Sequence, residues 1–272
     1  MEFSQVSSIS IMGMLFTLVL SVGFPVIFCI AACRKTNAKF TSVLWGCTGF
    51  IVFALILEQI LHMVVLGMSG NAIKDNIWLY ALYGSLAAAL FEETGRFIIM
   101  KFFMRKRLDR QNALLYGIGH GGIEAILLVG FTSISNMVVS LMINTGKIDT
   151  VFTGLDSASQ DLIYQQLSQL CTSPPYQFFL GGVERISALI FQIALSIIVY
   201  KAVKYEKFRY LILALVLHFA LDFIAITAQN YFNVIIVEII ILIISLVIGF
   251  YGLIIFKADK KQNNLQANAH VR

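Results

Sequence analysis

The sequence predicts an all-α membrane protein, a polytopic bundle of about seven transmembrane helices. Hydrophobic residues make up 58% of the chain and charged residues only 13%, and the mean hydropathy is +0.83. Soluble domains are roughly one quarter charged, so this composition excludes an ordinary soluble globule. Apolar runs long enough to cross the ~30 Å hydrocarbon layer as helices recur along the chain. We therefore expect a multi-pass protein, integral to the cell membrane and surrounded by the lipid bilayer.

The predicted spans follow one another with mostly short connections. They cover residues 8–32, 41–67, 77–100, 112–143, 178–200, 208–228 and 232–256. The fourth run exceeds the roughly 20 residues that one crossing needs, so it must tilt, break or extend beyond the bilayer. The one long connection, from about Asn144 to Tyr176, is polar, but its apolar residues predict a short surface helix over 157–170. We expect this helix on the outer side, where it caps the bundle or acts as a lid or substrate-docking element.

Positive charge is concentrated in alternate connections. The loops after the first, third and fifth spans and the segment after the last are rich in Lys and Arg, whereas the other connections carry only Lys74 and Lys147. Because cytoplasmic loops collect Lys and Arg, we place the N-terminus outside and the C-terminus inside. Topology then explains the net charge of +5, and no nucleic-acid partner is expected. We expect one transmembrane domain over residues 1–256 and a disordered basic cytoplasmic tail over 257–272.

Ionisable residues inside the apolar runs repeat one spacing. Three pairs are each four residues apart: Glu92 and Arg96, His120 and Glu124, and His218 and Asp222. Each pair therefore lies on one helix face. A charge at the bilayer centre costs at least ~2.5 kcal/mol on insertion scales, so such groups must face the interior, pair, bind an ion or do chemistry. With 1.5 Å of rise per residue, Glu92, His120 and His218 lie about 12 to 15 Å from the cytoplasmic ends of their helices, and Glu124 and Asp222 lie about one turn deeper, so these five residues could share one layer.

A second polar cluster is predicted in the outer half of the bundle. Glu58 and His62 are again four residues apart, and Glu184 with Arg185 stands near the start of the fifth span. One interpretation is a polar clasp between helices, in which His62 or Arg185 neutralises a buried acid. The alternative is a substrate or ion pathway toward the layer of ionisable pairs.

Four glycines surround His120 in the sequence: Gly117, Gly119, Gly121 and Gly122. Small residues let transmembrane helices approach closely, so we expect a tight helix contact here. Room for a substrate backbone beside the histidine is the functional alternative.

These residue types together suit the hydrolysis of an amide bond. A carboxylate near a neutral imidazole can hold and deprotonate a water molecule, and a second histidine can donate a hydrogen bond to the developing oxyanion. Adjacent residues on a helix point about 100° apart, so only one of Glu92 and Glu93 can face such a site squarely. The spacing alone does not decide between them.

Three short motifs carry a resemblance to a known group of enzymes: Glu92-Glu93-Thr94-Gly95-Arg96, Tyr116-Gly117-Ile118-Gly119-His120 and His218-Phe219-Ala220-Leu221-Asp222. They resemble, in order, the EExxxR, FxxxH and HxxxN/D motifs of the CAAX-protease and bacteriocin-processing (CPBP) intramembrane proteases. The segments His120-Gly121-Gly122-Ile123-Glu124 and Gly181-Gly182-Val183-Glu184-Arg185 make the chain most similar to the YhfC-type peptidases of that superfamily. The motifs cover three core helices directly and most of the chain in order and hydropathy.

The resemblance implies roles for the matching residues. Glu92, with His120, would activate the attacking water, and His218 with Asp222 would stabilise the oxyanion or bind a metal. Arg96, Tyr116, Glu124, Glu184 and Arg185 would bind substrate or support the site. The chain departs from the motifs in two ways. Only two residues lie between the glutamate pair and Arg96, whereas the motif has three, and Tyr116 stands where the motif has phenylalanine. Arg96 therefore lies on another helix face than the arginine of the motif, which leaves its role open.

A metal ion is one of two alternatives for the chemistry. Catalytic zinc usually takes three protein ligands, and His120, His218 and either Asp222 or Glu124 could supply them. The sequence contains no HExxH motif, in which two histidines bracket the catalytic base. A metal-free mechanism with a glutamate base is therefore the other alternative.

We expect an intramembrane endopeptidase that cleaves a membrane-associated peptide or protein. The alternatives are a secondary transporter or proton-coupled or cation-coupled membrane protein, and a non-catalytic accessory or immunity protein of the same fold. The sequence does not indicate the substrate or the oligomeric state.

Overall fold

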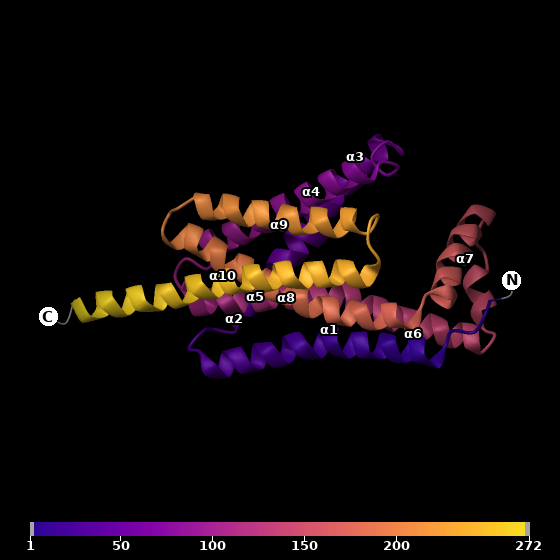
Figure 1. Ribbon diagram of the computed structural model, residues 1–272, viewed down its shortest axis with the longest axis horizontal. Coiled ribbons are helices and arrows are strands. Elements are labelled where there is room, and N and C mark those ends of the chain that lie inside the picture. Colours follow the sequence, from indigo (N-terminus) through magenta and orange to yellow (C-terminus); the bar gives the residue numbers. More distant parts are fainter. Residues whose placement is uncertain (1–2, 270–272) are drawn as a thin grey trace. The chain divides into compact units, whose positions relative to one another are not determined.

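A computed structural model describes residues 3–269, with side chains described up to Lys260. Every regular element in this range is helical (Figure 1). The elements are α1 (Ser8–Lys35), α2 (Thr41–Gly49), η1 (Phe50–Glu58), α3 (Gln59–Met68), α4 (Ile77–Ile98), η2 (Ile99–Phe103), α5 (Arg110–Glu124), η3 (Ala125–Gly130), α6 (Phe131–Asn144), η4 (Ile148–Phe152), α7 (Ser157–Thr172), α8 (Pro175–Lys204), α9 (Arg209–Ala228) and α10 (Val234–Ala269). The prediction of an all-α bundle is confirmed.

In the part of the chain that the structure describes, six helices are long and apolar enough to cross a membrane. They are Ser8–Lys35, Thr41–Met68, Arg110–Asn144, Pro175–Lys204, Arg209–Ala228 and Val234–Lys260. Each coincides with a predicted span, so the multi-pass membrane protein is confirmed. The remaining prediction, 77–100, falls on α4, a helix of 22 residues in which Glu92, Glu93 and Arg96 reduce the apolar character. The count of seven and the orientation stay predictions.

Three of the long helices contain a π-helical segment. The segments are η1 within Thr41–Met68, η2 after α4, and η3 between α5 and α6. The over-long fourth run thus forms one helical stretch, Arg110–Asn144, of 35 residues, which would reach about 50 Å at 1.5 Å per residue. π-Helical turns interrupt the regular hydrogen bonding of a helix and are frequent near functional sites.

The chain divides into two compact units. The smaller comprises Met1–Phe24 and Ala125–Ile186, and the larger comprises Pro25–Glu124 and Ser187–Arg272. In the smaller unit, Val6, Met14, Ile143, Ile148 and Leu167 form the apolar core. The expected surface helix is present in it as α7, which Asp156 caps by accepting a hydrogen bond from the Ser159 amide at 2.9 Å. The amide and the hydroxyl of Ser159 both donate to the Asp156 carboxylate and hold its pKa below the ordinary value.

The larger unit is built around the second part of α8. Its side chains Leu195, Ile198, Val199 and Tyr200 are completely buried in the main apolar core. Around it, α2 packs against α5 and α4 packs against α9. Small residues at four-residue spacing on α4, Ala81, Ser85 and Ala89, are buried, which lets neighbouring helices approach closely. This packing brings the ionisable residues of α4, α5 and α9 into one interior.

The α2–α5 contact depends on glycine. A Cβ atom on Gly119 would lie 2.1 Å from the Val43 carbonyl oxygen, and one on Gly46 would lie 2.1 Å from the Tyr116 carbonyl oxygen. Both distances are far shorter than atoms can approach, so only glycine fits at these two positions. The prediction that the glycines near His120 allow a close helix contact is confirmed.

The C-terminal helix extends beyond the predicted boundary at residue 256. α10 continues to Ala269, whereas the sequence predicts a disordered tail over 257–272, of which residues 270–272 lie outside the described part. Asp259, just beyond the predicted boundary, is buried and accepts hydrogen bonds from Lys204 at 2.9 Å and from Tyr205 at 2.7 Å. These contacts tie this part of α10 to the end of α8, so the helix continues past residue 256. A boundary drawn from hydropathy alone does not register them.

Candidate functional site

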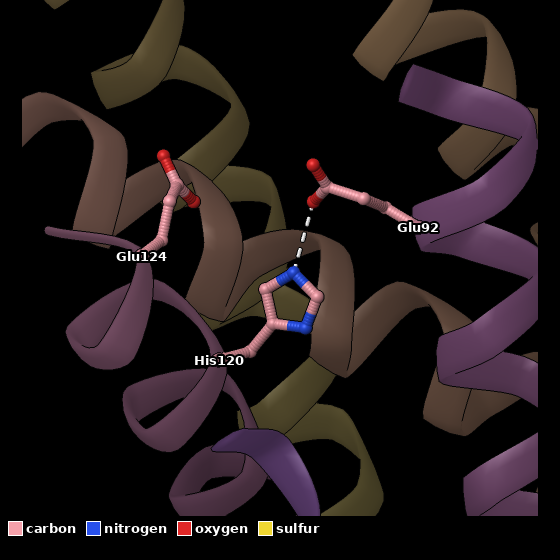
Figure 2. Close-up of side chains that lie close together, drawn as sticks. All are labelled: Glu92, His120 and Glu124. Carbon is pink, nitrogen blue, oxygen red and sulfur yellow. Dashed lines mark hydrogen bonds and ion pairs between the residues drawn. The ribbon is translucent and has the colours of Figure 1, made fainter. Parts of the chain in front are cut away.

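Glu92 on α4 and His120 on α5 lie in direct contact. Nε2 of His120 is 2.9 Å from Oε2 of Glu92 (Figure 2). His120 is completely buried and Glu92 is 8% exposed. The His120 ring also contacts the Phe50 ring edge to face, at 5.4 Å between centroids. The predicted pairing of a carboxylate with an imidazole in one layer is therefore present, although the two residues are 28 positions apart in the chain.

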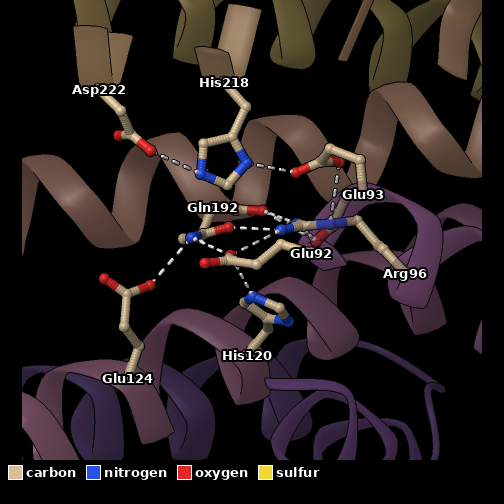
Figure 3. Close-up of polar contacts among 9 residues, drawn as sticks. Glu92, Glu93, Arg96, His120, Glu124, Gln192, His218 and Asp222 are labelled. Atoms are coloured by element: carbon tan, nitrogen blue, oxygen red, sulfur yellow. Dashed lines mark hydrogen bonds and ion pairs between the residues drawn. The ribbon is translucent and has the colours of Figure 1, made fainter. Parts of the chain in front are cut away.

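Glu93, the next residue of α4, contacts the other histidine. Its Oε1 lies 2.8 Å from Nδ1 of His218 on α9, and its Oε2 lies 3.2 Å from Nε of Arg96 (Figure 3). On the other side of the His218 ring, Nε2 lies 3.4 Å from Oδ2 of Asp222. Adjacent positions on α4 point about 100° apart, so the two glutamates serve two different histidines. The structure thus gives Glu92 and Glu93 different partners, which the spacing in the sequence alone could not assign.

Glu124 on α5 completes a group of possible metal ligands. One ligand atom from each of Glu92, His120 and Glu124 lies within 4.8 Å of the other two. Figure 2 shows the carboxylates of Glu92 and Glu124 on the same side of the His120 ring, the side that carries Nε2. His120 and Glu124 are four residues apart on one helix, so α5 presents both in the same direction, as their spacing predicts.

The contacts among Glu92, Glu93, Arg96, His120, Glu124, His218 and Asp222 form one polar network. It also includes two buried residues of α8, Gln192 and Ser196, which the sequence interpretation missed. Nε2 of Gln192 donates to Oε2 of Glu92 at 3.0 Å and to Oε2 of Glu124 at 2.9 Å. Arg96 donates to the main-chain and side-chain oxygens of Gln192 and to the Ser196 hydroxyl. Neither residue is ionisable, so neither drew notice. The available signal was a glutamine inside an apolar span with a serine four positions later.

The larger unit therefore gathers most of the predicted site residues. The family described as YhfC intramembrane metalloprotease matches residues 18–241 of the chain. The chain belongs to the YhfC family. A relative in Bacillus subtilis (strain 168), named as the uncharacterized membrane protein YhfC, is 39% identical over 188 residues, which cover 68% of this chain and 72% of that protein. No solved structure matches.

The description of the YhfC family implies a metal, and the donor set can be tested against that. Glu92, His120 and Glu124 offer one imidazole nitrogen and two carboxylate oxygens, which fits the three protein ligands and mixed donors of catalytic zinc sites. The grouping differs from the predicted set of His120, Glu124, His218 and Asp222. Among the described residues, the three-residue group does not include His218 or Asp222. The two nitrogens of the His218 ring contact Glu93 and Asp222 instead.

Tyr116 lies one helical turn before His120 and is completely buried. The two rings stack with 6.0 Å between centroids. Among the described residues, neither the Tyr116 hydroxyl nor Nδ1 of His120 has a hydrogen-bond partner. The contact fits a supporting role for Tyr116 in orienting the His120 ring.

The residues of the second predicted cluster belong to both units. Glu184 and Arg185 form an ion pair with each other in the smaller unit, and their expected role in substrate binding stays a prediction. In the larger unit, His62 contacts Glu58 at 3.1 Å and the Tyr83 hydroxyl at 2.8 Å. The second contact joins α3 to α4, as a polar clasp between helices would.

Proposed function

We propose that this YhfC-family protein is an intramembrane endopeptidase. It hydrolyses a peptide bond of a membrane-associated peptide or protein, and Glu92 and His120 act on the attacking water. The observation that carries the proposal is the 2.9 Å contact between Nε2 of His120 and Oε2 of Glu92, buried among apolar helices. The description of the family as an intramembrane metalloprotease supports the same reaction class.

The Glu92 carboxylate is the group best arranged to receive a proton. Its Oε2 atom contacts His120 and Gln192, while Arg96 lies farther away, at 4.0 Å. A carboxylate removed from water and held by hydrogen bonds can act as a general base once a water molecule lies within hydrogen-bond reach. In that role Glu92 takes the proton of the attacking water, and His120 keeps the carboxylate in place and shares the transferred proton.

His218 is the group arranged to stabilise negative charge on the substrate. Both ring nitrogens face carboxylates, Glu93 at 2.8 Å and Asp222 at 3.4 Å. Only an imidazole that carries both protons can donate to two acceptors at once. The longer contact involves Asp222, whose side chain is 32% exposed. Nε2 of His218 is therefore the donor that can turn to a developing oxyanion, while Glu93 keeps the ring oriented through Nδ1.

A metal ion fits the same residues. Glu92, His120 and Glu124 would hold it, and bound Zn²⁺ would supply an activated water at neutral pH and polarise the scissile carbonyl. Gln192 and Arg96 would then orient the ligating carboxylates. Cleavage with and without added chelator separates this version from the glutamate mechanism.

The test compares the new chain termini that peptide-bond cleavage produces in membrane proteins. Membranes from cells that express the wild type, Glu92→Gln or His120→Ala are analysed by mass spectrometry of new chain termini. We expect termini within or beside transmembrane segments in the wild type and a loss of at least about 100-fold in both variants, because general acid–base groups contribute roughly 10²- to 10⁴-fold.

Glu238→Gln, an acid replaced elsewhere in a span, serves as the matched control and should cleave like the wild type. Equal amounts of all four proteins in the membrane fraction show that insertion is intact. The same termini at full abundance in Glu92→Gln and His120→Ala would overturn the proposal and would favour a transporter or a binding protein.

A further inference from the structure

Gln192 has the most contacts with the network of any uncharged side chain described above, and no motif includes it. It lies on α8, is 4% exposed, and contacts residues of α4 and α5 (Figure 3). Its nitrogen donates to Glu92 and to Glu124, and its oxygen accepts from Arg96. A buried amide with both ends engaged is fixed in orientation, and its direction has chemical consequences.

Arg96 determines which way the amide points. A guanidinium group only donates hydrogen bonds and an ionised carboxylate only accepts them. In the observed orientation Oε1 faces Arg96, and Nε2 faces the two carboxylates. The reversed amide would set a donor against Arg96 and an acceptor against Glu92 and Glu124, which would cost all three hydrogen bonds. Arg96 is itself held by the Gln192 main-chain oxygen at 2.7 Å and by Ser196.

The amide nitrogen then holds two like charges together. It donates its two hydrogens to Oε2 of Glu92 and to Oε2 of Glu124, on different helices, with nitrogen-to-oxygen distances of 3.0 Å and 2.9 Å. Like charges repel more strongly away from water, so without this donor the two carboxylates would turn apart. Oε2 of Glu92 is also the atom that contacts His120. Gln192 therefore sets the direction of the carboxylate that acts on water.

We infer that Gln192 is a positioning residue for the proposed hydrolysis and that Arg96 acts through it by fixing its amide. The inference rests on the proposed function. It also assigns Arg96, which lies on a different face from the arginine of the family motif, a role of its own. Outer residues that orient catalytic groups or metal ligands typically contribute 10- to 100-fold to activity or affinity.

Two substitutions of similar size test the inference. Gln192→Glu keeps the shape but, when ionised, cannot donate and adds a third negative charge beside Glu92 and Glu124. Gln192→Met removes donor and acceptor without a charge, and it keeps the test valid if the first variant does not fold. Gln177→Glu, at an exposed position near the start of the same helix, is the matched control.

The assay uses a reporter peptide built from a segment whose cleavage Glu92→Gln abolishes. We expect kcat to fall about 10- to 100-fold in both Gln192 variants, with KM unchanged because Gln192 binds no substrate.

A double variant tests the link to Arg96. Arg96→Lys keeps the positive charge but cannot make the same set of contacts, and combined with Gln192→Met it should be no slower than the slower single variant. Wild-type kcat in both Gln192 variants, with Glu92→Gln inactive, would overturn the positioning role alone. Full cleavage by Glu92→Gln would overturn the proposed function, and the positioning role with it.

Discussion

Nδ1 of His218 on α9 lies 2.8 Å from Oε1 of Glu93 on α4. The neighbouring Glu92 contacts His120 instead. Two adjacent residues of one helix thus take part in two arrangements with different chemistry. Glu93 is completely buried between His218 and Arg96, which is the environment of a structural ion pair, whereas Glu92 keeps some exposure.

Glu93→Gln should destabilise the protein more than Glu92→Gln does. The first change removes the carboxylate closest to the buried Arg96 charge, at 3.2 Å, whereas the second removes one at 4.0 Å. Breaking a buried ion pair from one side costs about 3 to 5 kcal/mol, and the remaining amide hydrogen bonds reduce this toward the lower end. Thermal unfolding in detergent measures the difference. A Glu93→Gln protein that melts like Glu92→Gln would contradict the assignment.

The sequence predicted the helices and the paired residues well, because both depend on spacing within one segment. The four-residue spacing placed His120 beside Glu124 and His218 beside Asp222, and the structure shows both pairs on one face. It could not decide which carboxylate meets which histidine, because that depends on how α4 rotates against α5 and α9. Gln192 was missed for a related reason. An uncharged amide costs less in a span than a charged group does, and the role of Gln192 is visible only in its contacts with Glu92, Glu124 and Arg96.

Metal content should depend on Glu92, His120 and Glu124, not on Asp222. Glu124→Gln removes one of the three grouped ligands and should weaken Zn²⁺ binding at least 10-fold. Asp222→Asn, whose carboxylate contacts only the far side of His218 in the network, is the matched control and should keep the metal. Elemental analysis of purified protein and Zn²⁺ titration after chelation provide the measurement.

The opposite pattern, with metal lost in Asp222→Asn and kept in Glu124→Gln, would favour the ligand set first predicted from the sequence. A wild-type protein that cleaves its substrate fully after complete removal of metal would support Glu92 as the base without a metal.

Gly119→Ala should disrupt the contact that places His120. The added Cβ atom would lie 2.1 Å from the Val43 carbonyl oxygen, so α2 and α5 must separate. Overpacking of this kind typically costs about 1 to 3 kcal/mol, and displaced backbone raises the figure. Gly67→Ala, in the same long helix as Gly46 but with nothing within 4 Å, should be neutral or slightly stabilising. Equal melting temperatures for the two variants would show that α2 and α5 accommodate a Cβ atom at position 119 without loss of stability.

Asp259 should anchor the end of α10. It accepts hydrogen bonds from Tyr200 at 3.1 Å, Lys204 at 2.9 Å and Tyr205 at 2.7 Å. Asp259→Ala removes all three, and the loss of the acceptor for the buried Tyr200 hydroxyl costs about 1 to 3 kcal/mol. Trypsin should then cut the segment after residue 256 several-fold faster than in the wild type. The exposed Asp161→Ala serves as control, and unchanged cleavage in Asp259→Ala would mean that other contacts hold the helix.

Whether α4 crosses the membrane decides between six spans and seven. Its three ionisable residues, Glu92, Glu93 and Arg96, are buried within the protein, so crossing would expose none of these charges to lipid. Its 22 residues reach about 33 Å, enough for the hydrocarbon layer. We therefore expect α4 to cross, with Lys74 and Lys106 on opposite sides. In a chain whose four cysteines are replaced by serine, an impermeant maleimide should label Lys74→Cys in intact cells and Lys106→Cys only after permeabilisation. Equal labelling of both in intact cells would place them on one side and reduce the bundle to six spans.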